Sequence, residues 1–378
     1  MTQEAITLDH CLILTVNKTD DCIADGRILI KDGVIQSVGS SQCLAPEGRV
    51  YSMEGRIVMP GMVNTHTHSP STLFRGLADD MYLRQWLTEY MWPAEARLDA
   101  ELVYHGSRLG YLEYLRNGMT TNVDMWYFAD CVAQAAAQSG LRSVIAAGIF
   151  SFPSPQSDNS LRDASDFLEH WGARRKEFPN IIPCLGPHDV YTTTPQLLRQ
   201  AAALAKANRV MIHMHLSETQ RDNEECRSLY GRSPAQVAEE AGLFEQPVLC
   251  AHCIHLSADD MEIFRRNQVA ISYNPVTNMK LCEGVLPIPV LRKKGICVSV
   301  GVDGAQSNNS LKLLSDAKTG ILLQKLTSMD PCCLTATDMV RMLTIEGAKA
   351  IGMEQQIGSI EPGKQADLIS IDIDTAAT

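Results

Sequence analysis

The chain has 378 residues, of which 45% are hydrophobic and 20% charged, a mixture typical of a globular protein long enough for one large core. Its net charge of −11 argues against nucleic acid or an anionic membrane surface as the main partner. The 12 cysteines lie mainly inside apolar runs, and no uncharged apolar run reaches the roughly 18 residues that span a bilayer. The first residues, MTQEAITLDH, show no signal-peptide pattern. We therefore expect a reduced, cytoplasmic protein.

The beginning and the end of the chain are both rich in β-forming residues. CLILTV, GRILIKDGVIQSVG and GRVYSM are short β-like runs separated by turns, and Asp32-Gly33 marks a hairpin. The tail GSIEPGKQADLISIDID is again β-like, and we expect it to return to the N-terminal sheet. These segments predict a small β-sandwich domain built from residues 1–56 and 362–378. The short tail also raises the hypothesis of a truncated C-terminus.

From residue 57 onward, apolar runs alternate with helical stretches such as LDAELVYHGSRLGYLEYLRNG and TPQLLRQAAALAKA. Continuously apolar runs are expected for parallel strands covered by helices on the outside. Eight such units predict a (β/α)₈ TIM-type barrel over residues 57–361, in the α/β class. The expected strands cover residues 56–66, 120–125, 143–150, 181–189, 210–218, 248–255, 269–275 and 297–304.

One of these runs contains a C-x-x-C pair, Cys250 and Cys253, within VLCAHCIHL. Such a pair can bind zinc or carry out redox chemistry, but the sequence has no second C-x-x-C to complete a structural zinc site. The pair also lies in a strand-like run, where residues three apart face opposite sides. We expect both cysteines to pack in the core.

Five of the expected strands end in residues that can bind a metal or move a proton. In a barrel of this kind, catalytic groups lie at the carboxyl ends of the strands. A single histidine in such a place is weak evidence, whereas this repeated pattern is hard to obtain by accident. The residues are His66 and His68, then His188, then His215 and Glu218, then His252 and His255, and finally Asp303.

His66 and His68 are two residues apart, so they share one face of their strand and can hold one ion together. His215 and Asp303 could close the site from other strands. Three imidazoles and a carboxylate suit Zn²⁺, or less commonly Fe²⁺. We expect one metal ion, because the fourth strand offers His188 but no lysine to bridge a second. His213 shares a face with His215 but lies deeper, so we expect it to be structural.

A metal ion alone does not complete a hydrolytic site. It lowers the pKa of a coordinated water towards ~7, and a proton shuttle is also needed. Glu218 can protonate a ring nitrogen of a substrate, and His252 can take a proton from the attacking water and orient it. This set of groups predicts hydrolytic attack on a C=N or C=O carbon.

The sequence resembles the amidohydrolase superfamily over almost its whole length. The resemblance rests on PGMVNTHTH, HLSE, AHCIH, SVGVDG and GSIEPGKQADL. Within the superfamily, the chain is most similar to the methylthioadenosine/S-adenosylhomocysteine deaminases, through LFRGLADDMYLRQWLTEYMWPAEAR, GPHDVYTTTP, NPVTNMKL and GVDGAQSNNSL. Members of that branch are zinc enzymes that replace an adenine amino group by a carbonyl and release ammonia.

The resemblance implies a role for each matching residue. Glu218 matches the glutamate that protonates the ring nitrogen, and His252 matches the histidine that works on the attacking water. Asp303 matches a metal ligand that also accepts a proton. The other metal ligands are matched by His66, His68 and His215, and the substrate-binding residues by Glu95, which would hold the ribose hydroxyls, His188 and Trp92.

One departure from the branch concerns the substrate. The family often places an arginine near the end of the third strand, where it meets the carboxylate of S-adenosylhomocysteine. SVIAAGIF has Ala147 at that position, which argues against this substrate. Adenosine, methylthioadenosine or 5′-deoxyadenosine then becomes the favoured substrate. Because GPHDV also departs from the usual motif, a guanine- or pterin-type base stays open.

Two other classes of function compete with nucleoside deamination. The first is another hydrolase on the same scaffold, either an s-triazine-type chlorohydrolase or an amidase that opens a cyclic C–N bond. Glu218 favours a deaminase, since a ring nitrogen must be protonated there. The second is an inactive scaffold or a structural oligomer, against which the intact set of ligands and proton-transfer groups argues. From the resemblance we expect a homo-oligomer.

Overall fold

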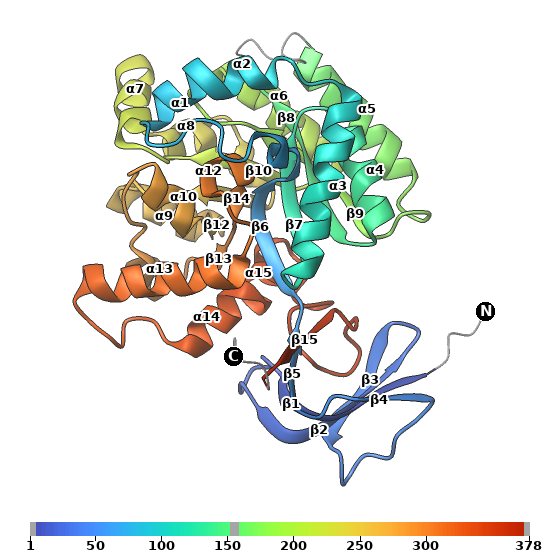
Figure 1. Cartoon of the computed structure of the whole chain (residues 1–378). Coiled ribbons are helices and arrows are strands. Elements are labelled where there is room, and N and C mark those ends of the chain that lie inside the picture. Colours follow the sequence, from blue (N-terminus) through green and yellow to red (C-terminus); the bar gives the residue numbers. More distant parts are fainter. Residues whose placement is uncertain (1–4, 152–158, 374–378) are drawn as a thin grey trace. The chain divides into compact units, whose positions relative to one another are not determined.

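The structure is a computed structural model that describes residues 5–151 and 159–373 (Figure 1). The chain divides into two compact units, one formed by Met1–Val63 with Ala336–Thr378 and the other by Asn64–Thr335. The sequence placed the domain limits after residues 56 and 361, and these limits stay a prediction. No helix among the described residues is long and apolar enough to cross a membrane.

The first unit contains a six-stranded β-sheet drawn from both ends of the chain. Its strand order is β15-β5-β1-β2-β3, and β4 pairs separately with β1. The predicted return of the tail is confirmed, because the last strand pairs antiparallel with β5. The strands are β1 (Ile6–Leu14), β2 (Cys22–Lys31), β3 (Val34–Ser40), β4 (Arg49–Ser52), β5 (Arg56–Pro60) and β15 (Leu368–Asp372).

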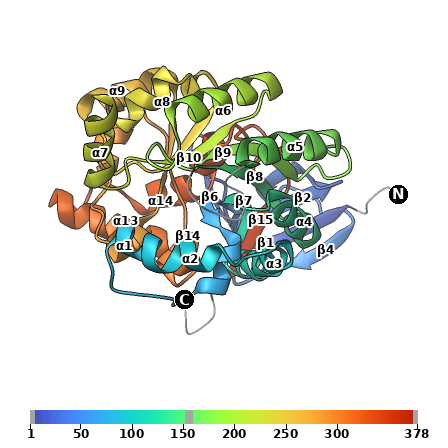
Figure 2. The same ribbon diagram turned by 90° about the horizontal axis from the view of Figure 1, so that it is seen from above.

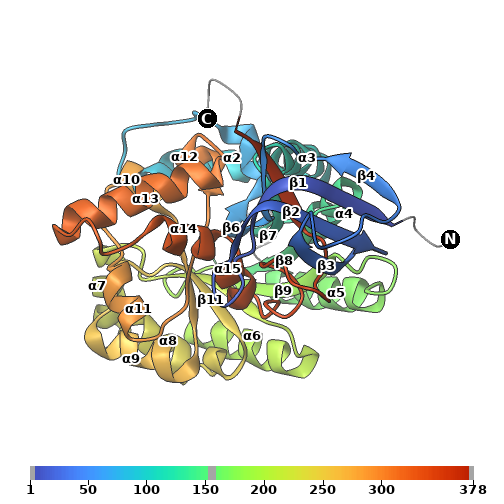
Figure 3. The same cartoon turned by 90° about the horizontal axis from the view of Figure 1, so that it is seen from below.

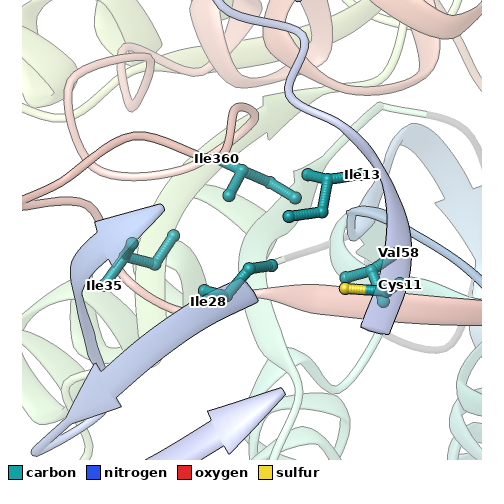
Figure 4. Packing of buried hydrophobic residues seen from close by; sticks show 6 residues of the cluster. All are labelled: Cys11, Ile13, Ile28, Ile35, Val58 and Ile360. Atoms are coloured by element: carbon teal, nitrogen blue, oxygen red, sulfur yellow. The ribbon is translucent and has the colours of Figure 1, made fainter. Parts of the chain in front are cut away.

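Two local features explain how this sheet folds. The predicted hairpin joins β2 to β3, and Asp32 and Gly33 both have the positive φ that a type I′ turn requires. His10 also has a positive φ and interrupts the register of β1, so the two halves of that strand pair with β4 and β5 respectively. The enclosed core, seen in Figure 4, consists of Cys11, Ile13, Ile28, Ile35, Val58 and Ile360.

The second unit is the (β/α)₈ barrel, whose strands are nearly all buried. The predicted first strand is split: Arg56–Pro60 belongs to the small sheet, and only the segment after Gly61 enters the barrel. The parallel strands are β6 (Met62–His68), β7 (Met119–Trp126), β8 (Arg142–Ile149), β9 (Ile181–Pro187), β10 (Ile212–Leu216), β11 (Val248–His252), β12 (Ala270–Tyr273), β13 (Val298–Val300) and β14 (Asp303–Gly304).

The barrel closes through its eighth strand, which is interrupted between β13 and β14. The first segment pairs with β12 and the second pairs with β6, so one stretch of chain joins both ends of the sheet. Gly301 lies in the interruption, and a Cβ there would come within 2.9 Å of the Cβ of His66. The Thr65 hydroxyl completes the closure by donating to the Val300 carbonyl at 3.0 Å.

Helices surround the strands, and α6, α8 and α9 lie side by side along one part of the barrel (Figures 2 and 3). Several begin at a side chain that accepts from the first turn, such as Thr194, Thr219 and Ser257. The helical segments of this unit are η1 (Ser69–Phe74), α1 (Leu83–Trp86), η2 (Leu87–Met91), α2 (Trp92–Glu95), α3 (Ala100–Arg116), α4 (Ala129–Ser139), α5 (Ser160–Ala173), α6 (Pro195–Asn208), α7 (Gln220–Tyr230), α8 (Pro234–Glu240), η4 (Leu243–Glu245), α9 (Ala258–Asn267), α10 (Pro275–Lys280), α11 (Ile288–Lys293), α12 (Ala305–Asn308) and α13 (Leu313–Ser328), while α14 (Ala336–Leu343) and α15 (Ile345–Ala350) belong to the first unit.

Candidate active site

Three imidazoles and one carboxylate meet at the carboxyl ends of the barrel strands. The Nε2 atoms of His66 and His68 lie 3.0 and 3.2 Å from Oδ1 of Asp303. His215 approaches from β10, with its Nε2 atom 3.3 Å from Nε2 of His68. The structure thus brings together all four residues that the sequence proposed as metal ligands.

The second ring nitrogen of each histidine has a hydrogen-bond partner. Nδ1 of His68 donates to the carbonyl of Met125, and Nδ1 of His215 donates to the carbonyl of His188, both at 2.8 Å. A proton on Nδ1 leaves the lone pair on Nε2, the atom that points into the site. The two rings are therefore oriented as ligands.

His213 orients His66, and the sequence did not predict this contact. Its Nδ1 atom lies 2.8 Å from Nε2 of His213, and Nδ1 of His213 donates to the carbonyl of Leu249 at 2.9 Å. Because His213 carries its proton on Nδ1, its Nε2 accepts the proton of His66. His213 does lie deeper in the barrel, as expected, but it contacts the site rather than only filling the core.

The donor set fits a divalent metal ion. Nε2 of His66 is fully buried and has no hydrogen-bond partner of acceptable geometry, although polar atoms surround it. Burial lowers the pKa of His66, and burial together with neighbouring histidines holds the pKa of His215 well below its usual range, so both rings are neutral. Burial opposes ionisation of Asp303, but the neighbouring rings of His66 and His68 hold the pKa of this carboxyl well below its usual value, so it is ionised. Neutral imidazoles and an ionised carboxylate are the ligands that zinc prefers.

Glu218 and His252 lie beside this cluster. Nε2 of His252 is 3.4 Å from Oε1 of Glu218, and both side chains are buried. Glu218 follows Ser217, whose positive φ turns the chain at the end of β10. His252 and Asp303 also have positive φ, an uncommon conformation for residues with a side chain, and one that clusters at functional sites.

The hydrogen bonds of His252 fix its tautomer. Nδ2 of Asn278 donates to Nδ1 of His252 at 2.8 Å, and Asn274 offers a second, longer contact of 3.4 Å. Nδ1 therefore accepts, and the ring proton is on Nε2, directed towards Glu218. Burial lowers the pKa of His252 to about 3, so the ring is neutral at neutral pH.

A pocket with about 710 Å³ of empty space, including its mouth, opens above these groups. This volume is in the range of small-molecule sites. One wall carries the site residues described above, and the remaining wall is largely aromatic and aliphatic. Its apolar members are Leu83, Trp86, Leu87, Trp92, Met125, Trp126, Tyr127, Phe150, Tyr191 and Leu281.

The three expected substrate contacts, Glu95, Trp92 and His188, all line this pocket. Glu95 is buried and accepts a hydrogen bond from the Tyr127 hydroxyl at 2.8 Å. Burial raises the pKa of Glu95 to about 7. The ring of His188 lies near that of His215, with centroids 4.7 Å apart, and Nδ1 of His188 bonds to the Thr192 hydroxyl.

The third barrel strand presents no cation to the pocket. Ala147 is buried and does not line the cavity, whereas its neighbour Gly148 does. A Cβ at Gly148 would lie 2.9 Å from Cε1 of Phe150, so an aromatic ring covers this part of the wall. No lysine or arginine is found among the described lining residues. Arg84 is nearby, but its guanidinium stacks on the Tyr191 ring and bonds to Glu225.

The C-x-x-C pair lies outside the metal cluster. Cys250 and Cys253 are both buried, and none of the 12 cysteines forms a disulfide. The expected core packing therefore agrees with the structure, although the chain leaves the strand at His252. Cys253 has a positive φ and returns towards Cys250, so the two do not face opposite sides.

Comparison with known proteins identifies the family. The model of the amidohydrolase family matches residues 57–378. This chain belongs to the amidohydrolase family. The match covers the barrel and the returning tail, and so includes every residue of the cluster.

Several named proteins resemble this amidohydrolase along nearly its whole length. A 5-methylthioadenosine/S-adenosylhomocysteine deaminase of Thermodesulfovibrio yellowstonii is 38% identical, with 96% of this chain and 83% of the relative aligned. A 5′-deoxyadenosine deaminase of Methanobrevibacter smithii is also 38% identical, over 100% and 86%. Among solved structures, an adenosine deaminase of Xanthomonas campestris with bound zinc superimposes with a TM-score of 0.93 at 30% identity, over 98% of this chain and 85% of that one.

Proposed function

We propose that this amidohydrolase hydrolyses the exocyclic amino group of an adenosine-like nucleoside and yields the inosine-type product and ammonia. The observation that carries the proposal is the convergence of three imidazole nitrogens and the Asp303 carboxylate, next to Glu218, on the floor of an aromatic pocket. The relatives named as nucleoside deaminases support this choice of reaction.

His66, His68, His215 and Asp303 would hold one divalent ion per subunit, which we propose to be Zn²⁺, with Fe²⁺ as the alternative that metal analysis tests. When bound, such an ion lowers the pKa of a coordinated water and so supplies the nucleophile at neutral pH. The orphaned lone pair of His66 and the neutral rings of His66 and His215 beside an ionised carboxylate support this assignment.

Glu218 acts as the general acid. Burial and the neighbouring Glu283 raise its pKa well above the usual value, so it is protonated at neutral pH and can give a proton to the ring nitrogen next to the amino-bearing carbon. We assign His252 to orienting the attacking water, because its Nε2 proton makes it a donor. The base role expected from the sequence would need the other tautomer.

The protons balance over one turnover. Glu218 protonates the ring nitrogen, where that proton stays in the product. One proton of the attacking water returns to Glu218, and the other reaches the leaving amino group through Asp303. The C–N bond then breaks, and ammonia leaves with three hydrogens. Ser307 donates to Oδ2 of Asp303 at 2.8 Å and keeps this carboxylate in place.

Glu95 would bind the ribose hydroxyls, with Tyr127 holding its carboxylate in position. Trp92 would pack against the sugar or base, and His188 would contact the substrate from the end of β9. These roles combine a few polar groups with an aromatic wall, as is common in sites for small molecules.

The lining of the pocket favours a nucleoside whose 5′ substituent is uncharged. A buried carboxylate needs a cationic or hydrogen-bonding partner, and the described lining of the pocket offers neither lysine nor arginine. Gly148 beneath Phe150 makes the third strand apolar at this point. Methylthioadenosine, 5′-deoxyadenosine or adenosine is therefore favoured over S-adenosylhomocysteine.

We further propose that the protein acts in the cytoplasm and as a homo-oligomer. The 12 free cysteines are consistent with a reducing compartment. Light scattering of the purified chain tests the oligomeric state.

The experiment that tests the proposed function is a coupled ammonia assay with metal-loaded protein. The panel is adenosine, methylthioadenosine, 5′-deoxyadenosine, S-adenosylhomocysteine, guanine, pterins and an s-triazine. We expect release from the first three, with S-adenosylhomocysteine at least about tenfold poorer in kcat/KM. Release only from guanine or a pterin, or dechlorination of the triazine, would move the assignment to the corresponding class.

A further inference from the structure

Glu283 is a buried carboxyl group next to the proposed acid and has no part in the reaction as described so far. It lies after α10 and is only 6% exposed. Its backbone is held on both sides: its N–H donates to the Asn278 carbonyl at 2.9 Å, and its carbonyl accepts from Nε2 of His255 at 2.7 Å. These two hydrogen bonds therefore hold in place the backbone from which the Glu283 side chain extends.

The carboxyl groups of Glu283 and Glu218 face each other. A carboxylate oxygen of each lies within 4.8 Å of the other and of a ring nitrogen of His252, and Oε1 of Glu283 is buried without a hydrogen-bond partner, so it is available to accept from a protonated Glu218. A hydrogen bond between two carboxyl groups requires a proton on one of them. Two buried carboxylates in contact cannot both be ionised, so the pair shares at least one proton at neutral pH.

Asn278 decides which of the two groups carries that proton. Its Nδ2 atom donates to Oε2 of Glu283 at 2.7 Å, which favours the ionised form of Glu283. The proton is then held by Glu218. The other hydrogen of the same Nδ2 donates to Nδ1 of His252, so one amide connects Glu283 to both groups of the proposed mechanism.

We propose that Glu283 is a positioning residue of the deamination. It keeps Glu218 protonated, so that Glu218 can donate this proton to the ring nitrogen, and through Asn278 it fixes the tautomer of His252. The inference rests on the proposed function and adds a residue to it. After Glu218 has given up its proton, two carboxylates stand side by side. Their repulsion favours the return of one proton of the attacking water to Glu218.

Other ionisable groups around Glu218 and Glu283 also favour the presence of a proton on this pair. Burial raises the pKa of both carboxyl groups, and the negative charges of Asp222 on α7 and Asp303 on β14 raise it further, so the pair as a whole retains a proton. Tyr191 also faces Glu218, and burial raises its pKa, so it stays neutral. His252 is the nearest ring and is neutral as well. Arg84 is a cation close to Asp222, but its guanidinium pairs with Asp222 and Glu225, at 3.9 and 2.8 Å.

The test is the pH profile of Glu283→Gln, measured on the metal-loaded full chain with the best nucleoside of the panel. The change keeps the size of the side chain, removes its charge and allows it to donate to Glu218. We expect the basic limb of kcat to move to lower pH by about one unit or more, and kcat at pH 8 to fall about tenfold. KM and metal content should stay within about twofold.

Two further variants separate positioning from a merely structural effect. Glu283→Asp restores the charge and should recover most of the wild-type basic limb. Asp260→Asn removes a different buried carboxylate, which accepts from the hydroxyls of Ser233 and Ser257, and should leave the profile unchanged. An unchanged limb in Glu283→Gln would overturn the inference, whereas a wild type without nucleoside deamination would overturn the proposed function instead.

If Glu283→Gln does not fold, infrared spectroscopy of the wild type gives an independent answer. The C=O stretch of a protonated carboxyl group should be present at pH 7, and the difference spectrum against Glu218→Gln should assign it to Glu218. Absence of that band would overturn the inference.

Discussion

Removing the ring nitrogens of His213 should weaken metal binding without touching any proposed ligand. In His213→Phe the aromatic volume is kept, but Nδ1–H of His66 loses the acceptor that lies 2.8 Å away. The buried proton is then unsatisfied, or it moves to Nε2 and blocks the ligand atom. An unsatisfied buried donor costs about 1–3 kcal/mol. Loss of the partner of a metal-binding histidine typically weakens affinity about 10- to 100-fold, or roughly 1.4–2.7 kcal/mol, so the two figures agree.

The assay is a competition with a graded series of chelator concentrations, followed by metal analysis of the washed protein. We expect the chelator concentration at half occupancy to fall about 10- to 100-fold in His213→Phe. The carbonyl of Leu249 also loses its donor, but it does so with and without metal, so it lowers thermal stability and not metal affinity. His105→Phe, at an exposed position of α3, is the matched control. Equal half-occupancy for wild type and His213→Phe would refute the orienting role.

Three further outcomes are expected. Glu218→Gln should keep its metal but lower turnover by at least about 10²-fold, and a nearly unchanged rate would rule out the acid role. Glu95 has a raised pKa of about 7, so it protonates as the pH falls through that value and loses part of its capacity to accept from ribose hydroxyls; KM for nucleosides should therefore rise below about pH 7, while Glu95→Gln should show a high KM at all pH values. His66→Ala should lose metal and activity with modest effect on the six-stranded sheet, and hydrogen exchange of that sheet together with metal analysis checks both statements.

Residue spacing and strand order predicted where the central cluster lies. His66 and His68 alternate correctly on one strand, and parallel strands bring His215 and Asp303 to the same end of the barrel. Because His188 and His252 reach that end too, the resemblance to the amidohydrolases was needed to single out the four ligands. The split of the first strand was not visible in the sequence, because RIVMPGMVNTH is apolar throughout and Gly61 gives only a weak signal for a change of sheet.

The groups that orient the cluster could not be read from the sequence. His213 meets His66 across the barrel interior, a contact that depends on the tilt and stagger of non-neighbouring strands. Glu283 lies in a loop, and only the three-dimensional path of the chain after α10 brings it to Glu218. The turn at Cys253 was missed for a local reason, since a positive φ at a cysteine has no sequence signature.

The left-handed backbone conformation of His252 and Asp303 lowers the stability of the fold at two residues that the proposed reaction needs. Glycine adopts this conformation at little cost, whereas a residue with a side chain destabilises the fold by about 1 kcal/mol or more at each position. Glycine at either place would relieve this strain, but it would also remove a buried, hydrogen-bonded side chain on which the chemistry of the pocket depends.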